Sequence, residues 1–288
     1  MNINTEIKKL YGTNNFFLKI RRKRKTKDKY WKDEIIDPDG KKRNRFTKIE
    51  KKKFYKNNKD LILKINKLNG KTVLDVGCGN GLLLSFLSKK FKKTGIEVDE
   101  KGIQEATKFA KIYRIDLNKN FKLRAIYDII ILNHVIEHLK KPDLLVQKLT
   151  KNYLKNGGYL IIGTPDFDCA MARRFGNKFR MLHDKTHISL FTFESLCRLF
   201  SKLKLKILDV HFPYFETEYF SNSGWGSPYR DGNNLVYSSA DGLSGFTVEN
   251  HYSNSDNSIE SFTYQYSDYS VLLRNSDTPK DSETLGEM

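Results

Sequence analysis

The feature that most constrains the fold is an apolar run that ends in an acid and three alternating glycines, VLDVGCGNG at 73–81. Apolar β-formers, a glycine turn and the apolar run LLLSFL at 82–87 predict a buried strand, a tight turn and a helix. Glycine allows positive φ values and lets a ligand approach the main chain. The first turn of the following helix offers free N–H groups and the positive end of the helix dipole. This combination predicts a site for a ligand with a nucleoside and a polar or negatively charged tail.

The spacing of the glycines separates this turn from two other nucleotide-binding turns. It is D-x-G-x-G-x-G, whereas the dinucleotide fingerprint is G-x-G-x-x-G and the phosphate loop ends in Lys-Ser or Lys-Thr. No such pair follows Gly81, so the sequence disfavours triphosphate binding. A second predicted strand, 93–98, carries Glu97 about twenty residues after the turn, where a doubly wound sheet places the carboxylate that holds a ribose.

These two segments resemble motif I and the following acidic strand of class I S-adenosylmethionine (SAM) methyltransferases. Three later segments extend the resemblance over residues 70–211: YDIIILNHVIEHL at 127–139, LKNGGYLIIGTP at 154–165 and HDKTHISLFT at 183–192. The last is similar to a turn of the ubiquinone-type O-methyltransferases, a branch that includes many sugar and natural-product enzymes. The resemblance implies an α/β fold with a doubly wound, mostly parallel seven-stranded sheet and helices on both faces. It also implies methyl transfer to a hydroxyl of a small molecule or saccharide.

The resemblance further implies where SAM, the expected cofactor, would bind. The glycine turn would contact its amino-acid end, Glu97 would accept hydrogen bonds from both ribose hydroxyls, and Asp75 would hold the ammonium group directly or through water. Asp116 could take the adenine amine with Leu117 against the ring, or could equally be a cap at the end of the third strand. The predicted cofactor-binding residues are Asp75, Gly77, Cys78, Gly79, Gly81, Glu97, Asp116, Leu117 and Asn133. No metal site is predicted, because the three cysteines lack metal-ligand spacing.

Two histidines are candidate general bases. Methyl transfer is a direct displacement, so the enzyme mainly aligns the acceptor, the methyl carbon and the sulfur, and a hydroxyl acceptor must also lose its proton. His134 follows the fourth predicted strand at the carboxyl edge of the sheet, and His187 lies in the HDKTHISLFT turn. The alternative for both is a role as hydrogen-bonding spacers. For His138 we favour packing or capping of a short helix together with Glu137.

The net charge of +18 is unevenly distributed along the chain. Residues 1–70 contain 23 Lys/Arg and 8 Asp/Glu, whereas residues 231–288 contain 2 and 10. We favour a solvated, lysine-rich surface as the explanation, because a charge run alone specifies no ligand. The alternatives are a polyanion-binding arm centred on RRKRK at 21–25 and pairing of this arm with the acidic C-terminal region. An RNA methyltransferase that uses the arm is therefore the alternative function. A SAM-fold scaffold without activity is disfavoured by the intact glycine turn and Glu97.

The predicted organisation has five parts: a basic arm at 1–46, a SAM-binding core at 47–211, an insertion over the active site at 212–262, a last sheet strand at 263–274 and a disordered tail at 275–288. We expect a cytoplasmic protein with reduced thiols, since there is no signal peptide and no apolar run of ~18–20 residues. Core helices are predicted at 47–68, 80–90, 100–110, 142–154 and 192–202, and strands at 72–76, 93–98, 112–115, 126–132, 158–163 and 204–211. The insertion carries aromatic rings that could line an acceptor site: Phe212, Tyr214, Phe215, Tyr219, Phe220 and Trp225.

Overall fold

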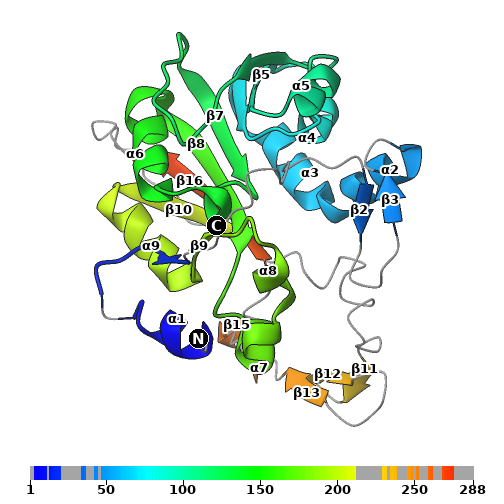
Figure 1. Cartoon of the computed structure of the whole chain (residues 1–288), viewed down its shortest axis with the longest axis vertical. Helices are drawn as coiled ribbons and strands as arrows, with labels where there is room; N and C mark the ends of the chain where they lie inside the picture. The colour runs from blue at the N-terminus through cyan, green and yellow to red at the C-terminus, as the bar shows by residue number, and fades with distance from the viewer. Residues whose placement is uncertain are drawn as a thin grey trace.

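A seven-stranded sheet with the order β10-β16-β8-β7-β4-β5-β6 forms the centre of the molecule (Figure 1). The computed structural model describes residues 3–11, 13–20, 34–36, 42–44, 47–211, 229–231, 234–238, 245–248, 251–252, 259–261 and 268–275. The sheet strands are β4 (Thr72–Val76), β5 (Lys92–Glu97), β6 (Lys111–Arg114), β7 (Tyr127–Asn133), β8 (Leu154–Pro165), β10 (Leu205–His211) and β16 (Asp268–Asn275). Strands β4 to β8 pair in parallel, and β16 lies antiparallel between β8 and β10. The predicted fold class is confirmed.

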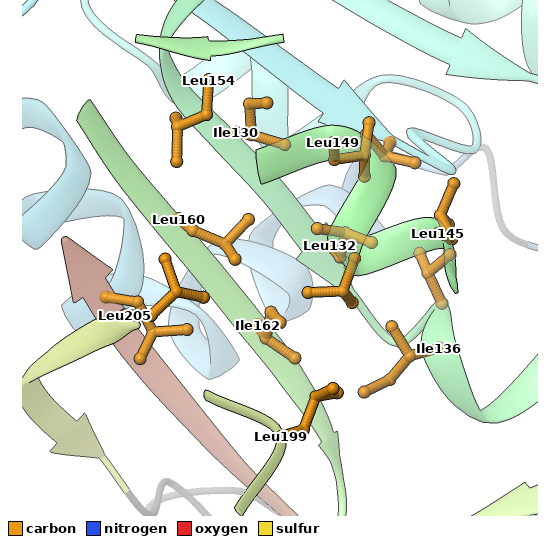
Figure 2. Close-up of a cluster of buried hydrophobic side chains, with 14 of the residues drawn as sticks. Ile130, Leu132, Ile136, Leu145, Leu149, Leu154, Leu160, Ile162, Leu199 and Leu205 are labelled. Carbon is orange, nitrogen blue, oxygen red and sulfur yellow. The ribbon is translucent and has the colours of Figure 1, made fainter. Parts of the chain in front are cut away.

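The sheet is covered on both faces because its central strands are apolar on both sides. In β7, Ile130 and Leu132 belong to one buried cluster and Ile129 and Ile131 to the other, and all four are 0% exposed. Successive side chains of a strand point to opposite faces, so a continuous apolar run fills two cores. The first core, shown in Figure 2, packs against α6 (Pro142–Asn152) and α9 (Phe193–Lys202). The second packs against α3 (Lys59–Lys67), α4 (Leu82–Phe86) and α5 (Glu100–Ala106).

The helix predicted at 47–68 is two helices, so that prediction is wrong at its middle. Helix α2 (Lys48–Asn57) begins after Thr47, whose side chain accepts a hydrogen bond from the Glu50 N–H. Asn58 then leaves the helical conformation, with φ −120° and ψ 14°, and α3 starts at the next residue. An asparagine can bond locally to the backbone, and here its side chain donates to the carbonyl of Phe54, which makes a helix end favourable.

Two other boundaries also differ from the prediction. Helix α4 ends at Phe86 instead of residue 90, because Leu87 is extended with ψ 147°. Helix α6 ends at Asn152, and β8 already begins at Leu154, which pairs with Tyr127. The Asn-Gly-Gly segment at 156–158, between the predicted helix and the predicted strand, therefore lies inside β8, where Gly157 has φ 71°.

The N-terminal residues pack onto the segment between β8 and α9. This segment comprises α7 (Ala170–Phe175), η2 (Gly176–Lys178), α8 (Arg180–His183) and β9 (Ser189–Leu190). Helix α1 (Ile3–Lys8) and the turn after it bury Ile3, Ile7 and Leu10 in a third cluster with residues of the segment. Strand β1 (Leu18–Lys19) pairs antiparallel with β9. Burying an Ile or Leu side chain contributes about 1.5–3 kcal/mol. This part of the predicted basic arm is therefore integral to the folded structure.

The remaining described elements are short. Strand β2 (Glu34–Ile36) pairs antiparallel with β3 (Lys42–Asn44), and β14 (His251–Tyr252) pairs antiparallel with β15 (Ile259–Ser261). A three-stranded antiparallel sheet consists of β11 (Tyr229–Asp231), β12 (Asn234–Ser238) and β13 (Gly245–Val248). The basic run 21–25, the six aromatic residues singled out at 212–225 and the tail after Asn275 lie outside the described residues. The five-part division of the chain stays a prediction. In the described part of the chain, no helix has the length and apolar character needed to cross a bilayer.

Candidate active site

The glycine turn between β4 and α4 has the left-handed backbone that only glycine adopts readily. Gly77, Gly79 and Gly81 have φ values of 72°, 55° and 75°. The N–H groups of Gly77 and Cys78 both donate to the carbonyl of Ile96 on β5, at 2.8 and 2.9 Å. This arrangement ties the turn to the neighbouring strand and fixes its position at the carboxyl edge of the sheet.

The turn is also packed too closely for side chains. A Cβ atom on Gly77 would lie 2.7 Å from Cγ2 of Val135, and one on Gly81 would lie 2.8 Å from Cα of Ala106. Both distances are shorter than real Cβ contacts, so these glycines are required by packing as well as by φ. The contact with Val135 places the turn directly beside the segment that follows β7.

Glu97, at the end of β5, joins the turn to the start of the next helix. Its side chain is buried, and one oxygen accepts from the Gly79 N–H at 2.8 Å. The other oxygen accepts from the N–H groups of Val98 and Asp99, at 2.6 and 3.0 Å. Hydrogen bonds to an ionised acceptor are roughly twice as strong as neutral ones, so this carboxylate shapes the turn as well as being the predicted ribose ligand.

Asp75 lies within β4 and is 3% exposed. Its burial and the nearby negative charge of Glu97 raise its pKa to about 7. A cationic partner would stabilise the ionised form of this carboxyl group, because an opposite charge nearby lowers the pKa of an acid. The position fits its predicted role toward the ammonium end of SAM.

The other predicted cofactor residues differ in how much their side chains could contribute. Cys78 is buried against β5, where a Cβ on Gly95 would come within 2.6 Å of its Sγ, and burial raises the pKa of its thiol. Its contribution would come through the backbone. Asp116 accepts a hydrogen bond from the Asn118 N–H at 3.0 Å, which is the capping alternative, and Leu117 packs partly buried beside the first core. Asn133 is partly buried at the last position of β7. All nine assignments stay predictions.

His134 has a strained backbone at the edge of the sheet. It directly follows β7, has φ 54°, and its N–H donates to the carbonyl of Gly163 on β8 at 2.8 Å. Positive φ values for residues other than glycine are uncommon and concentrate at functional sites. The side chain is 46% exposed, and Nδ1 lies 3.4 Å from Oε1 of Glu137.

Glu137 is the centre of a buried group that the sequence analysis assigned only to packing. Its side chain is 0% exposed, and Oε2 accepts from the Thr164 hydroxyl at 2.9 Å. Burial alone would raise its pKa, but the hydrogen bond from His134 and the nearby charges of His138 and His187 lower it to about 2. The i,i+3 spacing from His134 was the one sequence signal for this contact. Thr164, 27 residues from Glu137, gave no signal.

His187 lies deep in the same group. Its Nδ1 is 2.7 Å from the carbonyl of Met181, and because a carbonyl only accepts, Nδ1 carries a proton. Nε2 lies 3.7 Å from Oδ2 of Asp184, and the ring centroid is 4.8 Å from that of His138. The structure thus brings the two candidate bases to one buried carboxylate, and His138 packs against His187 with its pKa lowered by burial.

Three residues of this group could also hold a metal ion. Glu137, His138 and His187 each offer one ligand atom, and these atoms lie within 4.8 Å of one another. One carboxylate and two imidazoles form a donor set that Zn²⁺ takes in catalytic sites. The bonds from Thr164 and to Met181 resemble the outer partners that orient metal ligands. The sequence analysis predicted no metal site.

Comparison with known proteins identifies the family. The profile of a family described as a methyltransferase domain matches residues 44–210, which is more than half of the chain. This chain belongs to the methyltransferase domain family. The match confirms the class I SAM-dependent methyltransferase predicted from the glycine turn and the acidic strand.

The similar curated proteins belong to the predicted branch. The ubiquinone biosynthesis O-methyltransferase of Rickettsia canadensis (strain McKiel) is 31% identical over 106 residues, 34% of this chain and 44% of that protein. The enzyme of the same name from Nitrosomonas europaea is 29% identical over 113 residues, 35% of this chain and 46% of that protein. The aligned region therefore spans less than half the length of these relatives.

Solved structures resemble the chain at the level of the fold alone. One is a plantazolicin methyltransferase in complex with a monoazolic desmethylPZN analogue and S-adenosylhomocysteine (SAH). It is 18% identical with a TM-score of 0.47, and the match covers 80% of this chain and 85% of that one. The N-methyltransferase NodS from Bradyrhizobium japonicum WM9 is 15% identical with a TM-score of 0.46, covering 81% and 90%.

Proposed function

We propose that this chain transfers the methyl group of SAM to a hydroxyl group of a small molecule. The family match supports the class of reaction, and the names of the similar Rickettsia and Nitrosomonas proteins support a hydroxyl acceptor. The acceptor is a small molecule or a saccharide, because the HDKTHISLFT segment resembles a branch that includes ubiquinone-type, sugar and natural-product enzymes.

The observation that carries the hydroxyl assignment is the pair of His134 and Glu137. A hydroxyl must lose a proton as it attacks, and a histidine with Nδ1 directed at a carboxylate is held in the tautomer whose Nε2 accepts that proton. His134 has this arrangement, with Nδ1 3.4 Å from Oε1 of Glu137, and it is half exposed at the carboxyl edge of the sheet. His187 is 7% exposed, which favours a supporting role for it.

The cofactor half of the reaction would use residues of β4, β5 and the glycine turn. When bound, SAM supplies the methyl group from its sulfonium sulfur, which takes the electron pair of the broken C–S bond and leaves as the neutral thioether of SAH. Glu97 would accept from the ribose hydroxyls, and Asp75, once ionised, would bind the ammonium group. The close contact between Gly77 and Val135 supports placing the methyl group beside His134, since the turn and that segment touch.

The test is a transfer assay with methyl-labelled SAM and a panel of acceptors. The panel contains catechol, phenol and glucose as hydroxyl acceptors, an amine, and a short RNA for the alternative function. We expect label in one of the hydroxyl compounds, and His134→Ala should lower that turnover by ~10²–10⁴-fold while SAH affinity is kept. His134→Gln, which can still hydrogen-bond but cannot take a proton, should be equally slow. Label in RNA, with activity that falls steeply with salt, would favour the alternative instead.

A further inference from the structure

The described N-terminal residues 3–11 and 13–20, here named the N-terminal strap, run across the segment that carries His187. Ile3, Ile7 and Leu10 are 1–2% exposed and pack with Phe167, Cys169, Ala172, Phe179 and Leu190. The Ile3 N–H donates to the side chain of Asn177, and the Asn4 side chain donates to the carbonyl of Arg173. In Figure 1 helix α1 lies on the side of the molecule occupied by α7 and α9. We call the segment between β8 and α9, together with His134 and Glu137, the acceptor half of the site. The first helix therefore attaches the strap to the acceptor half.

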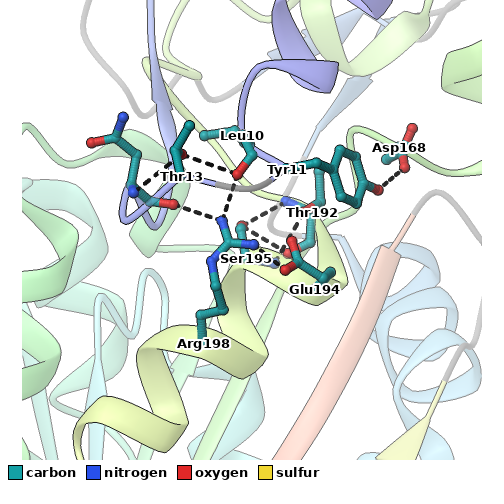
Figure 3. A network of polar contacts seen from close by, with 9 residues as sticks. Leu10, Tyr11, Thr13, Asp168, Thr192, Glu194, Ser195 and Arg198 are labelled. Carbon is teal, nitrogen blue, oxygen red and sulfur yellow. Dashed lines mark hydrogen bonds and ion pairs between the residues drawn. The ribbon is translucent and has the colours of Figure 1, made fainter.

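A polar network fixes the middle of the strap, as Figure 3 shows. Arg198 on α9 donates through Nη2 to the carbonyls of Leu10 and Asn15, both at 2.8 Å, and forms an ion pair with Glu194. The Tyr11 hydroxyl donates to Asp168, which also receives two hydrogen bonds from Arg173. Burial and the neighbouring Asp168 raise the pKa of Tyr11 to about 12, so the hydroxyl stays a donor at neutral pH.

The end of the strap connects to Glu137 through a single residue. The Ile20 N–H donates to the carbonyl of Ile188 at 2.9 Å, and the N–H of Ile188 donates to the carbonyl of Glu137 at 2.8 Å. Ile188 directly follows His187 and precedes β9, which pairs with β1. The backbone next to His187 is thus held by two hydrogen bonds of Ile188, one to the strap and one to Glu137, in addition to the bond from the His187 N–H to the carbonyl of Asp184.

The ring of His187 depends on the strap in a second way. The carbonyl that accepts from its Nδ1 belongs to Met181, and the Met181 side chain packs against the same cluster as Ile3, Ile7 and Leu10. If α1 left this cluster, the carbonyl that holds the tautomer of His187 would lose its support. The contacts named above reach the acceptor half through His187 and Glu137, whereas the predicted SAM contacts come from β4, β5 and the glycine turn.

We infer that the N-terminal strap is the positioning element of the acceptor half: it holds His187 in the Nδ1–H tautomer and in place against Glu137. The inference rests on the proposed function for the role of His187 in the reaction, whereas the contacts between the strap and His187 are independent of that function. It assigns the N-terminal strap to the acceptor half and gives the strap no role in SAM binding.

The test uses the full chain and needs no acceptor. Ile7→Asn places a polar amide in the cluster, and its matched control Lys8→Asn places the same residue at the exposed neighbouring position. Ile20→Pro removes the N–H that donates to Ile188, and its control Ile20→Val keeps that N–H and most of the side chain that packs beside the cluster. Three quantities are measured: the His187 tautomer by ¹⁵N NMR, hydrogen exchange of the Ile188 amide, and SAH affinity by calorimetry.

We expect Ile7→Asn and Ile20→Pro to populate the Nε2–H tautomer of His187 and to speed exchange of the Ile188 amide by about tenfold or more. SAH affinity should stay within about twofold in all four variants, and the two controls should match the wild type. An unchanged tautomer and unchanged exchange in Ile20→Pro would overturn the inference, even if Ile7→Asn fails to fold. Equal loss of SAH affinity would overturn it as well, because the strap would then be a general structural element. Failure of the proposed function would appear only in the transfer assay.

Discussion

Glu97 offers the sharpest test of the cofactor site, because its carboxylate accepts hydrogen bonds both from the glycine turn and from the two residues that follow β5. One oxygen accepts from Gly79, and the other accepts from Val98 and Asp99. The substitution Glu97→Gln keeps the size of the side chain and replaces one oxygen by an NH₂ group. Whichever way the amide is turned, its NH₂ faces a backbone N–H, so at least one buried donor loses its acceptor.

The magnitudes follow from these bonds. A buried donor without an acceptor costs about 1–3 kcal/mol, which should appear as a lower free energy of unfolding of the cofactor-free protein. Loss of charge-assisted hydrogen bonds to the ribose should weaken binding by about 1.5–3 kcal/mol, which is roughly 10- to 150-fold in the dissociation constant. Urea unfolding measures the first quantity, and calorimetry with SAH measures the second.

The control for this experiment is Glu100→Gln. Glu100 is the exposed first residue of α5, so the change in charge is the same but no bond to the glycine turn is lost. We expect this variant to unfold and to bind SAH like the wild type. If Glu97→Gln binds SAH within about twofold of the wild type, Glu97 is not the ribose ligand. If its unfolding free energy is unchanged, the carboxylate does not stabilise the turn.

Three further predictions concern charge at the site. The folded pKa of Asp75 is about 7 against 3.8 unfolded, so the stability that its neutral form contributes is complete below about pH 4 and is lost as pH rises to about 7. In urea unfolding, Asp75→Asn should therefore lose less stability than the wild type between about pH 4 and 7. SAH affinity measured by calorimetry should rise over the same range in the wild type and much less in Asp75→Asn, because the ligand's ammonium group favours the ionised carboxyl. Chelator-treated protein should bind Zn²⁺, and Glu137→Gln should weaken this binding by about tenfold or more while Glu194→Gln does not; equal binding in the two variants would exclude the group with His138 and His187.

The sheet and the glycine turn could be predicted from the sequence because their signals are local. An apolar strand, the glycines and Glu97 all lie within 25 residues, 73–97, and each strand carries its own β-forming run. Boundaries were less certain where a local bond competes with the helix, as at Asn58. The candidate bases were found from position, but their common partner Glu137 was missed.

What the sequence could not provide are the contacts between distant segments. Arg198 and Leu10 are 188 residues apart, and Tyr11 and Asp168 are 157 apart. Polar residues such as these have no periodic pattern, and a salt-bridging arginine looks like any other charge on an amphipathic helix. The packing of the N-terminal residues therefore emerged only from the structure.

The position of β16 has a consequence for how the chain reaches its native state. Residues 268–275 fill the space between β8 and β10, so the sheet stays split until these residues have been synthesised. Until then β8 and β10 each expose an unpaired edge, the kind of surface that recruits other chains. Joining β10 to β16 also means closing a loop of more than fifty residues, a slow and non-local step. The sheet of this protein therefore cannot be completed before residues 268–275 have been synthesised, and chains that end before residue 268 should aggregate, whatever the stability of the rest of the sheet.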